Sequence, residues 1–120
     1  MNQVFVLLVD DDEMSTQILK MILEDEGFEI DIATTGSEAV EKVLIKSYHV
    51  ILLDYKLPDM SGRDVAIKIR KAGLYPNIIL LTGYNIANED NLDEKPYNLV
   101  LLKPVPPPEI VKAIRGALKG

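Results

Sequence analysis

The sequence predicts an α/β protein, with helices on both faces of a five-stranded parallel sheet. Short apolar runs alternate along the chain with longer segments whose apolar residues recur every three or four positions, and this alternation is typical of parallel strands joined by helices. Residues 4–9 and 50–53 form two of these runs and contain no polar residue, as expected of strands that are buried on both faces. We expect a doubly wound sheet with the strand order 2-1-3-4-5.

The first half of the chain contains two predicted strands, each followed by a helix. The helix after residues 4–9 carries an apolar stripe, which consists of Met14, Ile18, Leu19, Ile22 and Leu23. Gly27 suits the position just after this helix.

The second strand, Glu29–Ala33, alternates polar and apolar residues, so we expect it at an edge of the sheet. Ser37 is predicted to cap the second helix. The residues that this helix should bury are Ala39, Val40, Val43 and Leu44.

Three strands are predicted in the second half of the chain. The third ends at Asp54, and a turn at residues 57–62 leads into a helix. The fourth covers residues 78–81, and the fifth covers 98–102, ahead of prolines that are tolerated in the first turn of the last helix. The apolar residues of these two helices are Val65, Ala66, Ile69, Ile110, Val111, Ile114 and Leu118.

The segment between the last two strands has a weaker pattern. Residues 83–98 are mostly polar, contain Pro96 and lack an apolar stripe. We therefore expect the fourth helix, which this segment would form, to be shortened or irregular.

Length and composition predict one domain over residues 1–120, because 48% of the residues are hydrophobic and can form a core. The net charge of -6 argues against direct nucleic-acid binding by this domain. The absence of cysteine excludes disulfides and thiolate metal sites. No apolar run approaches the roughly 20 residues that cross a bilayer, and no basic leader precedes the first strand. We expect a soluble, cytoplasmic domain with no membrane partner.

Polar groups follow four of the predicted strands. Asp10 and Asp11 follow the first strand, Asp54 ends the third, and Thr82 and Lys103 follow the fourth and fifth. Ligands of such sheets bind outside the carboxyl ends of the strands. Crowded carboxylates repel one another, so their convergence predicts a divalent cation, and Mg²⁺ suits carboxylates that share a site with a phosphate. An oxygen nucleophile, a hydroxyl donor and an amine together describe phosphoryl transfer to a carboxylate.

These motifs carry a resemblance to response-regulator receiver domains of two-component signalling. They are the Val-Asp-Asp-Asp at residues 9–12, Asp54 with the turn at residues 57–62, the Leu-Thr-Gly at residues 81–83, and Lys103-Pro104. Each motif alone is weak, but the four in this order and spacing are specific. The resemblance extends over essentially the whole chain and implies a flavodoxin-like fold.

The resemblance also implies the role of each residue. Asp54 is the expected acceptor of a phosphoryl group from a sensor histidine kinase or a histidine phosphotransfer protein, with Lys103 paired to that group and Thr82 hydrogen-bonded to it. The implied protein ligands of Mg²⁺ are Asp10, Asp11, Asp54 and the backbone carbonyl of Lys56. Such a domain is a switch or phosphorelay that assists its own phosphorylation and dephosphorylation, and is not a conventional enzyme. The resemblance also implies that the peptide bond between Lys103 and Pro104 is cis, as it often is at this position in the family.

Some acids and the histidine have simpler interpretations. Asp12 precedes the first helix and suits an N-cap, so we place it outside the metal ligands. His49 is the only histidine, and at a strand start we interpret it as structural or exposed.

Two positions depart from the family pattern. Many receivers have an aromatic residue three positions before the conserved lysine, where this chain has Val100. The domain then either signals through other contacts, with Tyr84 or Tyr97 as candidates, or serves mainly as a phosphoryl relay or sink. The weak pattern of residues 83–98 makes a conventional dimer through the fourth helix doubtful, and the oligomeric state stays open.

The same residues bear on rival functions. A haloacid-dehalogenase-like phosphatase needs a second Asp at position 56, where this chain has Lys. A flavodoxin-like mononucleotide binder needs a phosphate-binding loop after the first strand, where three acids would repel a phosphate. The main alternative is a degenerate receiver that acts as an unphosphorylated interaction module.

Overall fold

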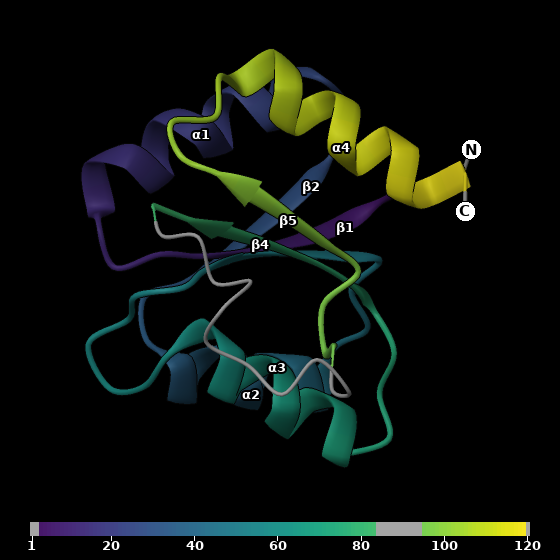
Figure 1. Ribbon diagram of the computed structural model, residues 1–120. Helices are drawn as coiled ribbons and strands as arrows, with labels where there is room; N and C mark the ends of the chain where they lie inside the picture. Colours follow the sequence, from purple (N-terminus) through teal and green to yellow (C-terminus); the bar gives the residue numbers. More distant parts are fainter. Residues whose placement is uncertain (1–2, 84–94, 120) are drawn as a thin grey trace.

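The protein forms a five-stranded parallel sheet between two layers of helices. Figure 1 shows the computed structural model, which describes residues 3–83 and 95–119. The strands are β1 (Phe5–Val9), β2 (Glu29–Ala33), β3 (Val50–Asp54), β4 (Asn77–Thr82) and β5 (Leu99–Leu102). The helices are α1 (Glu13–Asp25), α2 (Gly36–Ile45), α3 (Gly62–Lys71) and α4 (Pro107–Lys119).

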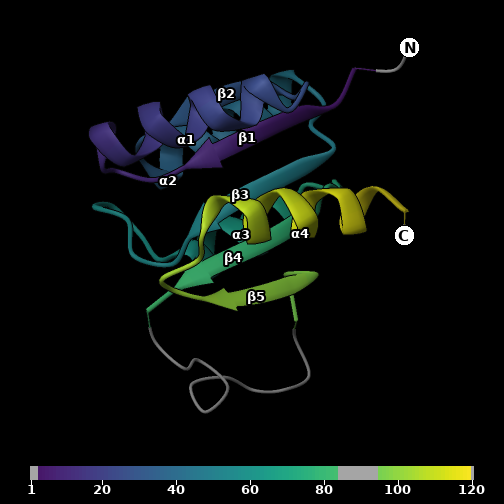
Figure 2. The same ribbon diagram turned by 90° about the horizontal axis from the view of Figure 1, so that it is seen from above.

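The strand order is β2-β1-β3-β4-β5, and every neighbouring pair is parallel. This order confirms the predicted fold class, and it places β2 at an edge as predicted. Helices α1 and α4 cover one face of the sheet, while α2 and α3 cover the other (Figures 1 and 2). The expectation of a shortened helix between β4 and β5 falls largely on residues 84–94, which lie outside the described residues.

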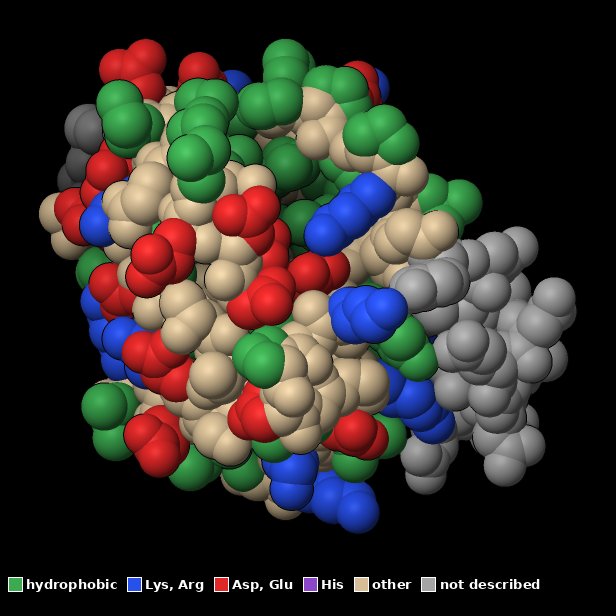
Figure 3. Space-filling model, turned by 90° about the vertical axis from the view of Figure 1, so that its left-hand side faces the viewer, with side chains coloured by type: hydrophobic (Ala, Val, Ile, Leu, Met, Phe, Trp, Pro, Cys, Tyr) green, Lys and Arg blue, Asp and Glu red, His purple; other side chains and the backbone are tan. Residues whose placement is uncertain are grey.

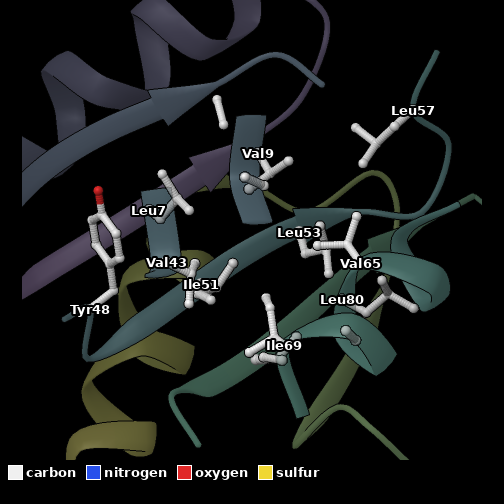
Figure 4. Packing of buried hydrophobic residues seen from close by; sticks show 14 residues of the cluster. Leu7, Val9, Val43, Tyr48, Ile51, Leu53, Leu57, Val65, Ile69 and Leu80 are labelled. Atoms are coloured by element: carbon white, nitrogen blue, oxygen red, sulfur yellow. The ribbon is translucent and has the colours of Figure 1, made fainter. Parts of the chain in front are cut away.

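The central strands β1, β3 and β4 are buried on both faces. Leu7 and Ile51 belong to the hydrophobic cluster beneath α2 and α3 (Figure 4), whereas Leu8 and Leu52 belong to the cluster beneath α1 and α4. Because both faces are covered, these strands need apolar residues at every position. Their polar groups can reach solvent only where the strands end.

Helix capping agrees with the sequence at α1 and differs at α2. The Asp12 carboxylate caps α1 as predicted and accepts a hydrogen bond of 2.7 Å from the Ser15 hydroxyl. The prediction that Ser37 caps α2 is wrong, because the chain enters this helix two residues earlier. Thr35 has the extended backbone of an N-cap, and its hydroxyl accepts the Glu38 N–H at 3.1 Å.

The apolar stripes of α1 and α2 also differ from the prediction. Leu23 of the predicted α1 stripe is buried and Leu19 packs against the cluster beneath α1 and α4, so this part of the stripe is confirmed. Met14 and Ile18 are instead 75% and 55% exposed, while Thr16, which was not predicted, is buried. The face of α1 that meets the sheet therefore includes only part of the predicted stripe. Leu44 of α2, which was expected to be buried, is 59% exposed.

Gly27 ends α1 as predicted. Its φ is 97°, and its N–H donates to the Glu24 carbonyl while the Phe28 N–H donates to the Leu23 carbonyl. These two bonds are those of a Schellman motif, in which glycine is favoured because of its positive φ.

In residues 3–83 and 95–119, no helix is long and apolar enough to cross a membrane.

Candidate functional site

The predicted site residues lie at the carboxyl edge of the sheet. In the register of β1 and β3, Val9 lies beside Leu53, so Asp10 and Asp54 come next on neighbouring strands. Figure 3 views this edge and shows acidic side chains gathered in the middle of the face, with basic side chains beside them.

Three carboxylates form what we call the acid cluster, namely Asp10, Asp11 and Asp54. One oxygen from each lies within 4.8 Å of the other two. Asp54 is 8% exposed, Asp10 is half-buried and Asp11 is exposed. The cluster therefore holds like charges together at the border between the core and solvent.

The crowding of the acid cluster affects the pKa of Asp10. Its partial burial raises the pKa of its carboxyl group, and the nearby charges of Asp54 and Asp11 raise this pKa further. The Asp12 N–H, which donates to the Asp10 carboxylate at 3.1 Å, and the charge of Lys103 oppose this shift. The net direction is upward, so the folded protein disfavours the negative charge on Asp10.

Lys103 brings a positive charge to the cluster. Its ammonium group lies 2.8 Å from a carboxylate oxygen of Asp54. Its backbone N–H donates to the Thr82 carbonyl at 2.8 Å, which holds the ends of β5 and β4 together. The peptide bond between Lys103 and Pro104 is cis.

A cavity of about 490 Å³ opens over these groups. Of the predicted residues, Asp11, Asp54, Lys56, Thr82 and Lys103 line it, and Asp10 adjoins it through the acid cluster. Thr82 is 1% exposed. Leu57, Pro58 and Gly83, which belong to the motifs at residues 57–62 and 81–83, also line the cavity. Tyr55 is a lining residue that the sequence analysis did not identify.

The turn after β3 folds tightly against the end of its strand. The Gly62 N–H donates to the Tyr55 carbonyl at 2.6 Å, and Lys56 pairs with Ser61 in a short antiparallel bridge. A β-carbon at position 62 would lie 2.5 Å from the Asp54 carbonyl oxygen. Only glycine allows this close approach of backbone to backbone, and the approach brings Lys56 to the cavity.

Asp59 is a further polar residue of this turn that the sequence did not single out. Its carboxylate accepts hydrogen bonds from the N–H groups of Gly36 and Ser37 at 2.8 and 2.9 Å. The partners are 22 and 23 residues apart in sequence, so no local pattern could have revealed the contact.

The side chains of Asp12 and His49, which the sequence analysis placed outside the metal ligands, are bonded to residues outside the acid cluster. Asp12 is engaged with Ser15, and this hydrogen bond lowers the pKa of its carboxyl group. His49 precedes β3, at the opposite end of that strand from Asp54, and its Nδ1 accepts the Phe5 N–H at 3.0 Å. Val100, at the position where many receivers have an aromatic residue, is 38% exposed on β5.

The donor set suits a hard divalent cation. All the groups that the sequence analysis named as ligands are oxygen donors, and three of them are carboxylates. Mg²⁺ prefers oxygen ligands and commonly binds through a few carboxylates together with waters and a phosphate. The residues at this edge therefore match Mg²⁺ in donor type and in charge.

Comparison with known proteins gives a consistent assignment. The sequence matches the model of the response regulator receiver domain over residues 6–115. It is 37% identical over 114 residues to the transcriptional regulatory protein SrrA of Staphylococcus aureus, covering 95% of this chain and 47% of that protein. The chain thus spans about half the length of the curated relatives that it matches.

Two solved structures are similar over nearly the whole chain. The response regulator protein TrrA from Thermotoga maritima, in complex with Mg(2+)-BeF, has a TM-score of 0.85 at 33% identity and covers 96% of this chain and 99% of its own. A CheY-like response regulator receiver domain protein from Methanospirillum hungatei has a TM-score of 0.83 at 31% identity, covering 98% of this chain and 95% of its own.

Proposed function

The chain belongs to the response regulator receiver domain family, and from this premise we propose that it is a Mg²⁺-dependent phosphoacceptor of a two-component system. Asp54 is the proposed acceptor, and a phosphohistidine of a sensor histidine kinase or a histidine phosphotransfer protein is the proposed donor. The observation that carries the proposal is the 2.8 Å ion pair between Lys103 and Asp54, at a cavity that Asp11 and Thr82 also line.

In the proposed reaction a carboxylate oxygen of Asp54 attacks the phosphorus atom. The new bond joins that oxygen to phosphorus, and the bond between phosphorus and the donor's imidazole nitrogen breaks. The imidazole leaves with the electron pair of this bond, and Asp54 becomes an aspartyl phosphate. Its position at the end of buried β3 limits the directions from which the donor approaches, and such positioning is a large part of catalysis in phosphoryl transfer.

Lys103 and Thr82 have complementary parts in this proposal. The Lys103 ammonium group is already beside the attacking carboxylate, and it would turn to a phosphoryl oxygen as negative charge moves there. The hydroxyl group of Thr82 would donate a hydrogen bond to another phosphoryl oxygen. Fixed donors of this kind stabilise the charge that develops in the transition state.

We propose that the protein holds Mg²⁺ through Asp10, Asp11, Asp54 and the backbone carbonyl of Lys56. When bound, the cation supplies positive charge that offsets the acid cluster and the incoming phosphoryl oxygens. The raised pKa of Asp10 supports this assignment, since burial and the charges of Asp54 and Asp11 already disfavour its anionic form.

The proposed setting is cytoplasmic, where a kinase or a phosphotransfer protein would dock. The name of the Staphylococcus aureus relative links that protein to transcription. For this domain we propose no direct contact with nucleic acid, because its net charge is -6 and its functional edge is acidic.

Intact-mass spectrometry after incubation with acetyl phosphate tests the proposal. The native chain should gain one phosphoryl group in the presence of Mg²⁺ and none when Mg²⁺ is removed with a chelator. The Asp54→Asn variant should gain none in either condition. It is a close structural match, because the amide has nearly the shape of the carboxylate that it replaces.

The contrary result has a defined meaning. A native chain that forms no adduct with Mg²⁺ and acetyl phosphate would favour the degenerate receiver that acts as an unphosphorylated interaction module. An adduct that persists in Asp54→Asn would place the acceptor at another residue.

Signal transmission after phosphorylation needs a residue that links the cavity to the rest of the domain. Tyr97 is half-buried against the cluster beneath α2 and α3. It is therefore a candidate to transmit the signal in place of the aromatic residue that many receivers have at the position of Val100. Nuclear magnetic resonance shifts confined to the cavity after phosphorylation would favour a relay or sink. Shifts that reach α4 would favour a switch.

A further inference from the structure

The Asp59 carboxylate joins the turn after β3 to the start of α2. One of its oxygens accepts the Gly36 N–H at 2.8 Å, and the other accepts the N–H and the hydroxyl of Ser37, both at 2.9 Å. Gly36 and Ser37 are the first two residues of α2, where backbone N–H groups have no acceptor within the helix. One side chain thus satisfies two of these donors from a distant part of the chain.

The electrostatics favour the ionised form of Asp59. A carboxylate at a helix N-terminus is stabilised by the helix dipole. The N–H groups of Gly36 and Ser37 hold the pKa of Asp59 below its usual value. At neutral pH the side chain is therefore an anion with both of its oxygens engaged.

Packing supports the same contact. A β-carbon on Gly36 would lie 2.8 Å from the Met60 sulfur and 2.9 Å from a methyl group of Val65. The residue after Asp59 therefore fits closely against the first residue of α2. Asp59 itself is exposed, so its hydrogen bonds, and not its burial, make its tie to the helix.

The turn that is held in this way forms one wall of the cavity. Lys56, Leu57 and Pro58 line the cavity beside Asp11 and Asp54. At its base the turn is fixed to β3 by the bond from Gly62 to Tyr55. Asp59 fixes its tip, so the two ties together set the position of the Lys56 backbone.

We propose that Asp59 is a positioning residue for the phosphorylation site, whose carboxylate fixes the turn against α2 and so holds the Lys56 carbonyl and the cavity wall in place for Mg²⁺. This inference rests on the proposed function, since it assigns the Lys56 carbonyl as a ligand. Mg²⁺ demands near-ideal octahedral geometry, so a small displacement of one ligand weakens its binding.

The expected effect is a weaker affinity for Mg²⁺ with an intact acceptor. Residues that hold a metal ligand in place typically change metal affinity by about 10-fold to 100-fold when they are replaced. Only one of several ligands depends on Asp59, so we expect Asp59→Ala to weaken Mg²⁺ binding about 10-fold. Saturating Mg²⁺ should restore the rate of adduct formation from acetyl phosphate, which a general loss of folded protein would not allow.

The experiment is calorimetric titration of Mg²⁺ into the native chain and three variants. Asp59→Ala removes all three hydrogen bonds, while Asp59→Asn keeps one acceptor oxygen and should have an intermediate affinity. Asp31→Ala is the control, because Asp31 is also an aspartate with more than one hydrogen bond, from Lys46 and Tyr48 at 2.9 and 2.7 Å, and it belongs neither to the acid cluster nor to the cavity lining. Hydrogen exchange of the Gly36 and Ser37 amides reports the loss of the tie directly.

The outcomes separate this inference from the proposed function. Native affinity in both Asp59 variants overturns the inference, as does an equal weakening in Asp31→Ala. If Asp59→Ala does not fold, Asp59→Asn decides the matter alone. A native chain that neither binds Mg²⁺ nor forms an adduct overturns the proposed function, and this inference with it.

Discussion

The charged groups at the two ends of the central strands are arranged differently: like charges are clustered at the carboxyl end, whereas opposite charges are paired near the amino end. At the carboxyl end, Asp10, Asp11 and Asp54 bring three acids within 4.8 Å of one another, and Lys103 pairs with Asp54. Just before the amino end of β3, Lys46 and Tyr48 donate hydrogen bonds to Asp31 of the edge strand β2, and the His49 ring accepts the Phe5 N–H. We call this second group the amino-end network, and it consists of Asp31, Lys46, Tyr48 and His49.

Arg70 extends the pattern of matched partners beyond the amino-end network. Its guanidinium group donates to the carbonyl oxygens of Leu74, Pro76 and Pro96, at 3.2, 2.9 and 3.0 Å, and to the side chain of Asn98 at 2.9 Å. One cation thus ties the end of α3 to the chain before β4 and before β5.

The difference separates groups that stabilise the fold from groups to which we assign a chemical role by proposal. In the amino-end network, a donor meets an acceptor and a cation meets an anion. In the acid cluster, burial and repulsion raise the pKa of Asp10, and shifts of this kind are common at functional sites. We infer that the acid cluster is kept at a cost to stability because it binds a cation and a phosphoryl group.

The largest expected effect comes from removing the positive charge of the carboxyl end. Lys103→Met should slow adduct formation from acetyl phosphate about 100-fold, the lower end of the loss typical for one donor to a developing oxyanion. Lys46→Met, which breaks the pair with Asp31, should leave the rate within about twofold of native. Time-resolved intact-mass spectrometry at fixed Mg²⁺ measures both rates, and similar losses in the two variants would contradict the contrast.

Neutralising one acid at each end should change stability in opposite directions. Without Mg²⁺, Asp10→Asn should raise the free energy of unfolding by about 0.5–1 kcal/mol, because it removes repulsion while its amide oxygen still accepts the Asp12 N–H. Asp31→Asn should lower it by a few tenths of a kcal/mol, because an exposed ion pair contributes about that much.

Urea unfolding in the presence of a chelator measures both changes. A loss of stability in Asp10→Asn would mean that the acid cluster is not repulsive in the folded protein.

Lys56→Asn tests a side chain at the wall of the cavity. Because Lys56 lines the cavity next to the acceptor, its replacement should alter the approach of water to the aspartyl phosphate and change the phosphoryl lifetime several-fold. The decay of the adduct after removal of acetyl phosphate gives this lifetime. An unchanged lifetime would remove the Lys56 side chain from the mechanism.

The smallest expected effect is a pH dependence of stability from the amino-end network. Hydrogen bonds from Lys46 and Tyr48 lower the pKa of Asp31, so its contribution to stability is complete above the unfolded pKa of about 3.9. That contribution is lost as the pH falls through the lower pKa of the folded state. Asp31 is partly exposed, so the loss should be a few tenths of a kcal/mol.

Urea unfolding between pH 6 and pH 3 should therefore show the native chain and Asp31→Asn converging at the acid end. A constant difference between them across this range would contradict the pKa shift.

The sequence predicted those features that depend on short-range pattern. Unbroken apolar runs identify strands that must be covered on both faces, so the ends of β1, β3 and β4 could be read as the places where polar groups emerge. Asp12 and Gly27 follow local rules of helix ends, and both are confirmed. The assembly of Asp10, Asp11 and Asp54 followed from the strand order alone.

The features that could not be predicted depend on where distant segments meet. Ser37 resembles a helix cap in sequence, but the chain enters α2 at Thr35, and the N–H of Ser37 is bound by Asp59. Met14 and Ile18 share a stripe by spacing, yet which face of α1 meets the sheet is set by packing. The tie made by Asp59 spans 22 and 23 residues and has no local signature.

The central claim is that the excess negative charge at the carboxyl end of the sheet forms a site for a cation and a phosphoryl group. The dependence of the free energy of unfolding on Mg²⁺ tests this claim. The native chain should gain about 2.7 kcal/mol when Mg²⁺ reaches about 100 times its dissociation constant, and Asp11→Ala should lose most of this gain. No stabilisation of the native chain, or an equal gain in Asp11→Ala, would contradict the account.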